Sequence, residues 1–344
     1  MAGVGLTVST PLQRFADRLL EQAERATSAG PRATFSVAGR GIEVRFASAM
    51  LYDALAPAWS ALPALIGEAA ATIHVVDRDV ASDPPAPPWP ADAYRPRDEL
   101  AGVGDERLEV GYQLTTATLM VWDAATRTGV WWTRSAAAVP VWERAMPLRA
   151  LLRWALRDLG LALVHGAVVG VGAHVDRPAV LLAGAGGSGK TTLALAAQLA
   201  RWHYVADDYC AVDPATGLVA PVTSFAKATA GTLARLPGLA GLRAPLPPAP
   251  DGKVVLAVRP EAGLRLSLLA LPRVVSVATP PTPCGGAATM AALAPTSLLQ
   301  LPGSRPVDRE LLAQVVRRVP AVTLPSGPDL GATLSGLRRV LEDR

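Results

Sequence analysis

The chain contains few cysteines, and this scarcity limits the class of protein to which it belongs. Only Cys210 and Cys284 occur in 344 residues, far apart in the sequence. Two isolated cysteines provide neither the paired spacing of a metal site nor a framework of disulfides. Because disulfide-rich chains belong to oxidising compartments, we expect a cytoplasmic protein with reduced thiols.

Long apolar runs are also missing. The uncharged, apolar stretch at residues 159–175 contains four glycines and His165, and it is too short to be a good membrane-spanning helix. No basic and apolar secretion signal opens the chain. We therefore expect neither membrane insertion nor secretion. Half of the residues are apolar and 18% are charged, which is typical of a folded chain long enough for two domains.

Lysine is the rarest charged residue. Of 33 basic side chains only Lys190, Lys227 and Lys253 are lysines. The net charge of +4 is spread without basic blocks or interleaved aromatic residues, so we expect no nucleic-acid partner. A coding bias explains the arginine excess, but a lysine in such a chain can also mark a position that needs a compact ammonium group. Lys227 and Lys253 are therefore candidate contacts to phosphate or substrate.

The first half of the chain is expected to be rich in strands. Helical spacing of apolar residues predicts an amphipathic helix at 12–26. Six prolines within residues 82–98 predict an irregular loop. Six of the eight tryptophans precede residue 143, and we interpret them as a core or docking face rather than a ligand cage. Strands are expected at 33–37, 42–46, 71–76, 115–122 and 130–133.

The second half predicts alternating strands and helices, which indicates an α/β domain. A helix is expected at 147–159, with Pro147 in the first helical position. Residues 236–262 contain six prolines and receive no assignment. We divide the chain into a smaller β-rich α+β N-terminal domain, 1–146, which is a candidate for substrate docking, and a phosphate-loop domain, 147–344. The latter is expected to contain strands at 161–171, 178–183, 202–206 and 321–324, and helices at 307–319 and 328–341.

One motif points directly to a ligand. Residues 184–191 read Gly-Ala-Gly-Gly-Ser-Gly-Lys-Thr, between the apolar run 179–182 and a helix-like stretch at 191–199. A G-x-x-x-x-G-K-[ST] loop between a strand and a helix cradles phosphates with its backbone N–H groups. We expect ATP and Mg²⁺ here, with Lys190 at the β/γ-phosphates and Thr191 on the metal. The expected nucleotide-binding residues are Gly184, Ala185, Gly186, Gly187, Ser188, Gly189, Lys190, Thr191 and Thr192.

A pair of carboxylates follows the next expected strand. Asp207 and Asp208 end the stretch His203-Tyr204-Val205-Ala206-Asp207-Asp208. If this strand returns parallel to and beside the loop strand, both carboxylates lie at the sheet edge where ligands bind. One can accept the proton of an attacking hydroxyl while the other holds the metal; the alternative is a turn that caps the next element. The chain contains no N-K-x-D motif, which would indicate a GTPase, and no S-G-G-Q motif, which would indicate a transporter.

His165-Gly166, the loop 184–191 and Val205-Ala206-Asp207-Asp208 occur in the order found in HPr kinase/phosphorylase. Residues 163–210 thus resemble the catalytic domain of that family, whose fold is α/β. The resemblance implies that Asp207 is the base toward a serine hydroxyl and that His165 supports the pair. It also implies that Lys190 and Thr191 hold ATP and Mg²⁺, with Asp208 nearby as a candidate catalytic residue and metal ligand. Taken alone, a histidine on an apolar strand is more typical of a core.

The chain departs from that family in three respects. Thr191-Thr192 stands where the family has Ser-Glu, the later E-[VI]-R-G-x-G signature is missing, and the first 150 residues do not suggest the usual partner domain. HPr is therefore not the expected substrate. The chain is more similar to the divergent HPr-kinase-like group that includes lasso-peptide precursor kinases. This resemblance implies a β-rich N-terminal part and a serine acceptor on a ribosomally made precursor peptide.

Three functions are compatible with these motifs. The first is an ATP-dependent kinase of a serine or threonine hydroxyl in a peptide or small protein. The second is a kinase of a small-molecule alcohol that uses the same residues. The third is a nucleotide-dependent binding module without transfer chemistry. Assembly into a homo-oligomer is compatible with all three.

Overall fold

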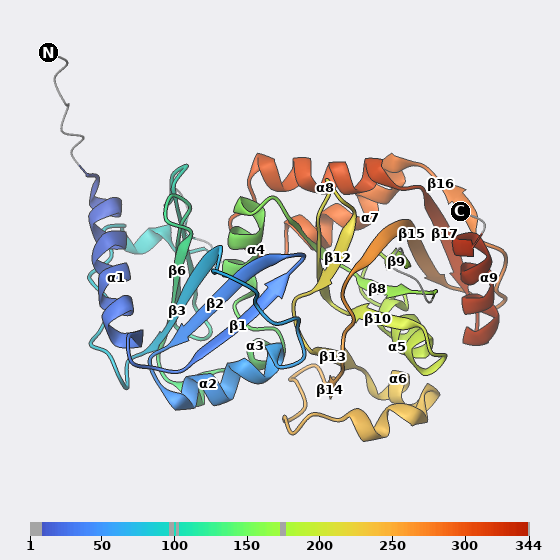
Figure 1. Cartoon of the computed structure of the whole chain (residues 1–344), viewed down its shortest axis with the longest axis horizontal. Helices are drawn as coiled ribbons and strands as arrows, with labels where there is room; N and C mark the ends of the chain where they lie inside the picture. Colours follow the sequence, from blue (N-terminus) through green and yellow to red (C-terminus); the bar gives the residue numbers. More distant parts are fainter. Residues whose placement is uncertain (1–8, 96–99, 101–102, 173–176, 343–344) are drawn as a thin grey trace, which may run out of the picture.

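The protein is a mixed α/β structure built around two large sheets (Figure 1). A computed structural model describes residues 9–95, 100, 103–172 and 177–342, and this part of the chain contains nine α-helices. The expected domain ends at residues 1 and 344 lie outside the described residues. Every strand of the six-stranded sheet precedes residue 147 and every strand of the nine-stranded sheet follows it.

The six-stranded sheet has the order β1-β2-β3-β6-β5-β4. The two strands predicted at 33–37 and 42–46 are confirmed: β1 and β2 pair antiparallel across Ala38-Gly39, both with positive φ, as a tight hairpin turn requires. Helix α1 (Pro11–Thr27) packs on β3 and β6 and lies at the left end in Figure 1. The strands are β1 (Arg32–Val37), β2 (Arg40–Phe46), β3 (Ala71–Asp77), β4 (Leu108–Gln113), β5 (Thr118–Asp123) and β6 (Thr128–Thr133).

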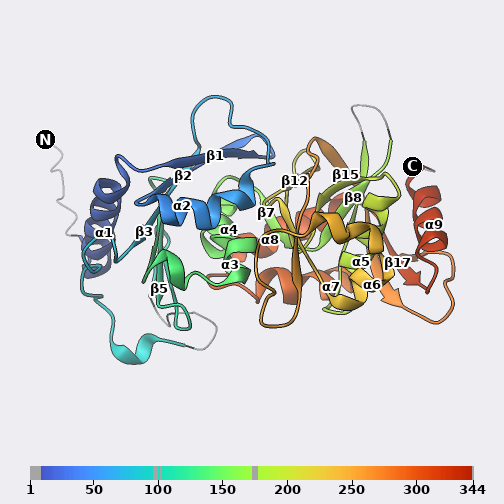
Figure 2. The ribbon, with the colours of Figure 1, turned by 90° about the horizontal axis from the view of Figure 1, so that it is seen from below.

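The nine-stranded sheet follows the path β10-β8-β9-β15-β12-β11-β7, with β17 beside β15 and β16 beside β17. A separate two-stranded sheet joins β13 (Phe225–Ala228) to β14 (Val254–Ala257). Figure 2 shows the two large sheets side by side along the molecule. The strands are β7 (Ala162–His165), β8 (Ala167–Gly170), β9 (Pro178–Leu182), β10 (His203–Ala206), β11 (Tyr209–Val212), β12 (Leu218–Pro221), β15 (Leu264–Val274), β16 (Thr282–Cys284) and β17 (Ala321–Ser326).

The helices cover the outer faces of these sheets and the space between them. In Figure 1, α7 and α8 lie above the second sheet, while α5 and α9 lie at its right-hand end. None of the described helices combines the length and apolar character needed to cross a membrane. The remaining helices are α2 (Ala49–Leu55), α3 (Val141–Ala145), α4 (Arg149–Asp158), α5 (Lys190–Leu199), α6 (Ala230–Arg235), α7 (Gly286–Leu298), α8 (Pro306–Arg318) and α9 (Leu330–Glu342).

Helix α4 connects the two sheets through a shared apolar core. It contacts both β5 and β7, and Trp122 and Trp154 belong to the same buried cluster as Leu163 and Tyr209. The interpretation of tryptophans as core residues is confirmed for Trp122, Trp131 and Trp132, which are fully buried. Because one hydrophobic cluster crosses residue 147, the division of the chain into two domains stays a prediction.

Several element boundaries differ from expectation. The helix expected at 147–159 begins at Arg149, and Leu148 adopts a left-handed conformation before it, so the interpretation of Pro147 as the first helical residue was wrong. Residues 115–117 do not belong to a strand, whereas β4 and β15 were not predicted. The irregular loop is confirmed up to residue 95 apart from a short 3₁₀ turn at Ala91–Ala93, and residues 96–98 lie outside the described part.

The arrangement of strands around the phosphate loop was also mispredicted. The stretch 161–171 forms two strands, β7 and β8, that break at Gly166 and pair with different partners. Strand β8 pairs antiparallel with both β9 and β10, so β10 is not the direct neighbour of β9. Strand β10 still runs in the same direction as β9, because two antiparallel steps restore the direction. The carboxylates at its end therefore stay on the side of the loop.

Candidate functional site

The phosphate loop has the backbone geometry that its glycines predict. It leaves β9 after Leu182 and ends where α5 begins at Lys190. Gly187 and Gly189 have φ angles of 80° and 97°, which side chains other than glycine adopt only with strain. Gly189 precedes the first residue of α5, so the N–H groups at the start of this helix face the loop, as in anion-binding helix termini.

Lys190 lies across the loop that precedes it. Its Nζ donates to the backbone oxygens of Gly184 at 2.6 Å and Ala185 at 3.1 Å, and only 8% of the residue is exposed. Burial lowers the pKa of Lys190, while the charges of Asp207 and Asp208 oppose this shift. The ammonium group is thus held at the mouth of the loop by carbonyl groups that a phosphate can replace as partners.

Asp207 is linked directly to the phosphate loop. The Thr191 hydroxyl donates to Asp207 Oδ1 at 2.8 Å, and Asp207 is 3% exposed. Burial and the adjacent charge of Asp208 raise the pKa of Asp207 to about 6, although the bond from Thr191 opposes the shift. The structure therefore joins the last residue of the motif to the first carboxylate of the pair.

Asp208 faces two basic side chains. His165 Nε2 lies 3.2 Å from Asp208 Oδ1, and Lys227 Nζ lies 2.6 Å from Asp208 Oδ2. Burial alone would raise the pKa of Asp208, but the hydrogen bond from His165 and the charge of Lys227 outweigh it and hold this pKa well below its ordinary value. The structure brings His165 to the carboxylate pair, as the resemblance implied.

The backbone at Asp208 is unusual. Its φ is +74°, and the Tyr209 N–H donates to the Asp207 carbonyl at 3.0 Å. A hydrogen bond between residues two apart, with positive φ between them, is typical of the rarer and strained form of γ-turn. The Gly166 N–H also donates to the Asp208 carbonyl at 3.1 Å. This turn breaks β10 from β11 opposite the break between β7 and β8, and strained residues of this kind cluster at functional sites.

The two remaining lysines lie on neighbouring parts of the small sheet. Lys227 belongs to β13, where it pairs in register with Val255 of β14. Lys253 directly precedes β14, and its Nζ lies 2.7 Å from Asp251 Oδ2. Both lysines line the same cleft as Lys190, Asp207 and Asp208. The structure therefore brings together the residues that the sequence singled out, except that Gly184 and Ala185 line a neighbouring cavity rather than this cleft.

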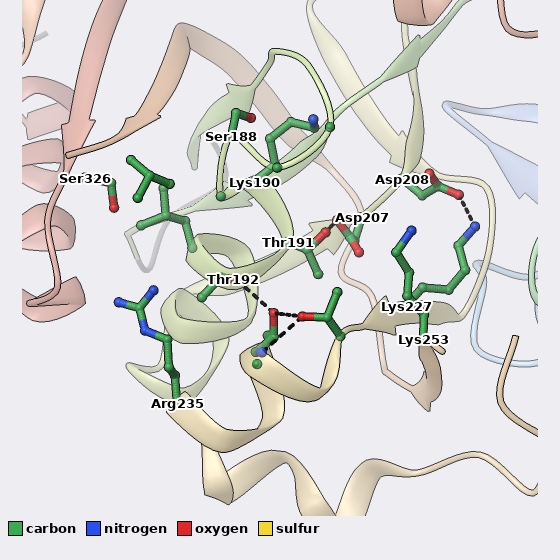
Figure 3. A pocket seen from close by; sticks show the side chains of 18 of the residues that line it. Ser188, Lys190, Thr191, Thr192, Asp207, Asp208, Lys227, Arg235, Lys253 and Ser326 are labelled. Carbon is green, nitrogen blue, oxygen red and sulfur yellow. Dashed lines mark hydrogen bonds and ion pairs between the residues drawn. The ribbon is translucent and has the colours of Figure 1, made fainter. Parts of the chain in front are cut away.

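The cleft has a volume of about 430 Å³ and extends to both sides of the phosphate loop (Figure 3). Asp208, Lys227 and Lys253 lie toward one side, whereas Arg235 and Ser326 lie toward the other. Thr192 lies between these two groups, and its hydroxyl contacts the Thr232 hydroxyl at 2.9 Å. Residues that sequence reasoning missed also line this cleft: Thr229, Gly231, Thr232, Arg235, Val274, Ser326 and Leu330.

These missed residues come from segments that carried no motif. Thr229 caps α6 by accepting from the Thr232 N–H at 3.1 Å, a Thr-x-x-Thr pattern that is a recognisable helix start. Arg235 ends the same helix, directly before the proline-rich stretch that received no assignment. Val274 ends the unpredicted β15, and Ser326 ends the parallel neighbour of that strand. Only the cap at Thr229 could have been read locally.

The residues present fit a magnesium-bound triphosphate. The Ser188 hydroxyl is buried and has no hydrogen-bond partner among the described atoms. Side chains added at Gly186 or Gly187 would meet no atom within 4 Å, which leaves room beside the loop backbone. Magnesium ions take one or two protein oxygens together with substrate phosphates and water, and Thr191 with an aspartate beside it supplies such a set.

No protein-family model matches this chain, and no curated protein matches it.

Proposed function

We propose that this protein is an ATP-dependent kinase that transfers the γ-phosphoryl group to a serine or threonine hydroxyl of a peptide or small protein. In this proposal residues 147–344 form an HPr-kinase-like domain. The observation that carries the proposal is the hydrogen bond between Thr191 of the phosphate loop and Asp207, next to a second carboxylate on a strained turn. Two carboxylates adjoining a phosphate loop suit phosphoryl transfer, which depends on positioning and electrostatics.

The nucleotide is held by the loop and by Lys190 in this proposal. Loop N–H groups and the N-terminus of α5 attract the phosphates, and the Lys190 ammonium moves from the carbonyls of Gly184 and Ala185 to the β- and γ-phosphate oxygens. Magnesium, when bound, neutralises charge that develops on the transferred group. Thr191 is the first protein ligand for it, as expected from the motif.

The contacts favour a division of labour between the two aspartates. Because the Thr191 hydroxyl donates a hydrogen bond to Asp207, its own lone pairs remain free and would be available to a metal ion. We therefore assign Asp207 to the metal side and Asp208 to the acceptor, whereas the family resemblance implies that Asp207 is the base. Asp208 stays ionised and still has free lone pairs after binding His165 and Lys227. Its lowered pKa makes it a weak base, so its role is to orient the acceptor hydroxyl by accepting a hydrogen bond.

A peptide or protein acceptor is favoured by the size of the cleft. Its volume of about 430 Å³ lies toward the lower end of the range of about 300–1,000 Å³ for sites that hold a single ligand. A bound nucleotide would occupy most of this volume. The acceptor hydroxyl must then approach from the open side near Asp208, which suits a residue on a larger molecule, as in a ribosomal precursor peptide.

Transfer of labelled phosphate from ATP to a library of serine and threonine peptides tests this proposal. Lys190→Ala should abolish nucleotide binding, whereas Asp207→Asn and Asp208→Asn should retain nucleotide binding but reduce transfer by at least about 10²-fold. Asp53→Asn, which changes an exposed aspartate outside the cleft, is the matched control. Full transfer by both aspartate variants would contradict the proposed chemistry.

A further inference from the structure

All three lysines of the chain converge on one cleft. They come from the start of α5, from β13 and from the turn before β14, yet Lys190, Lys227 and Lys253 line the same volume. Figure 3 shows Lys227 and Lys253 beside each other on the side marked by Asp208, away from Arg235 and Ser326. This side of the cleft is therefore richer in positive charge than the phosphate loop alone requires.

The three ammonium groups differ in what holds them. Lys190 rests on loop carbonyls, and Lys227 is paired with the mostly buried Asp208 at 2.6 Å. Lys253 is paired with Asp251, which stands two residues earlier on the same turn. The Lys253 side chain is 41% exposed and that of Asp251 is 54% exposed. Because exposed ion pairs contribute little, Lys253 can exchange Asp251 for an anion of a ligand without much loss.

The side of the cleft on which Lys253 lies points to the acceptor rather than to the nucleotide. Loop N–H groups, Lys190 and a metal together supply the positive partners that the triphosphate oxygens need. Lys227 balances the charge of Asp208, the carboxylate assigned to the acceptor hydroxyl. None of these groups requires Lys253, whose partner in the ligand-free protein is the exposed Asp251, so the anion that can replace Asp251 arrives with the acceptor.

We propose that Lys253 binds an anionic group, a carboxylate or a phosphate, that the acceptor carries close to its reacting hydroxyl. This inference rests on the proposed kinase function and deepens it, because it makes the substrate an acidic peptide or protein segment. Lys253 is a binding residue in this scheme: it selects and orients the acceptor and takes no proton.

Three peptides that differ at one position test the inference. Each contains a single serine acceptor, flanked by aspartate, by phosphoserine that is already blocked as an acceptor, or by asparagine as the neutral control. For the wild-type protein the two acidic peptides should have a lower KM than the neutral one. Lys253→Ala should raise the KM of the acidic peptides about tenfold and leave the KM of ATP and of the neutral peptide unchanged. The acidic peptide whose KM rises more in the Lys253→Ala variant identifies the preferred anion as carboxylate or phosphate.

Three further variants sharpen the comparison. Lys253→Arg keeps the charge and should retain most of the preference for acidic peptides. Arg259→Ala removes an exposed cation from the same stretch of chain outside the cleft, and it should change nothing. Asp251→Asn removes the competing carboxylate while its side-chain oxygen can still accept from the Lys253 N–H. This variant should lower the KM of the acidic peptides about twofold.

Direct binding separates this inference from the proposed function. Fluorescence anisotropy of labelled acidic peptides, measured without ATP, should show weaker binding to Lys253→Ala than to the wild type. Equal binding, or an equal loss for acidic and neutral peptides, would overturn the role of Lys253. A change in the KM of ATP alone would instead place Lys253 on the nucleotide and would also overturn it. If no peptide is phosphorylated, the proposed function fails, while the binding comparison still decides whether Lys253 recognises an anion.

Discussion

Replacing Asp208 separates its charge from its backbone conformation. Asp208 has a φ of +74°, and the cost of such a conformation for a residue with a Cβ is roughly 1–3 kcal/mol. Glycine is free of this cost but loses about 0.5–1 kcal/mol more in chain entropy than alanine on folding. The substitutions Asp208→Gly and Asp208→Ala both remove the carboxylate, so their difference in stability isolates the backbone.

We expect the glycine variant to be more stable than the alanine variant by about 1 kcal/mol, which reverses their usual order. Asp208→Asn keeps an oxygen near His165 and Lys227 but loses the charge, and it should cost about 1 kcal/mol relative to wild type. Urea unfolding measures all three free energies, with phosphate transfer measured on the same samples. If the alanine variant is more stable than the glycine variant, the inference that the backbone is strained at Asp208 is wrong. If Asp208→Asn transfers phosphate at the wild-type rate, the acceptor role of this carboxylate is wrong.

Two other predictions concern residues of the same site. Because burial raises the pKa of Asp207 to about 6, its protonated form stabilises the ligand-free protein below about pH 4, and this stability is lost as the pH rises through about 6. Asp207→Asn should therefore increase the free energy of unfolding at pH 7.5 by on the order of 2–3 kcal/mol, and flatten its pH dependence between 4 and 6; an unchanged pH profile would refute the burial of this charge. Gly166→Ala places a Cβ 2.7 Å from the Leu182 carbonyl oxygen and should destabilise the fold by about 1–3 kcal/mol in thermal unfolding. Gly186→Ala, whose Cβ meets nothing within 4 Å, should leave stability unchanged and weaken only nucleotide binding, and equal melting shifts for both would contradict the packing described.

Elements with strong local patterns could be predicted from the sequence. Helix α1, the β1–β2 hairpin and the strand–loop–helix around residues 184–191 follow from apolar periodicity and glycine placement, because these features act within a few residues. Strand β4 was missed since part of it is polar and, among the described strands, it pairs only with β5. The long β15 was missed because Pro272 near its end resembles a break, whereas the strand is held by β9 and β17 on its two sides.

The site was predictable as a set of residues but not as an arrangement. Nothing local indicates that β10 pairs with β8 rather than with β9, since this depends on pairing across the whole sheet. The positive φ of Asp208 has no signature in the sequence, because aspartate usually adopts a negative φ, whereas glycine adopts either sign readily. Lys227 was singled out by its rarity, but its contact with Asp208 depends on how the β13–β14 sheet packs against the phosphate-loop helix.

The position of the transferred phosphate is the most direct test of the proposed hydroxyl kinase activity. A serine peptide with an acidic flank is incubated with Mg·ATP and the protein. Fragmentation of the peptide in a mass spectrometer then identifies the residue that carries the phosphate. We predict one added phosphate on the serine hydroxyl with the wild-type protein and none with the Asp208→Asn variant. Binding of ATP with no phosphate on any peptide, or release of all phosphate to water, would contradict a hydroxyl kinase and favour a nucleotide-dependent binding module.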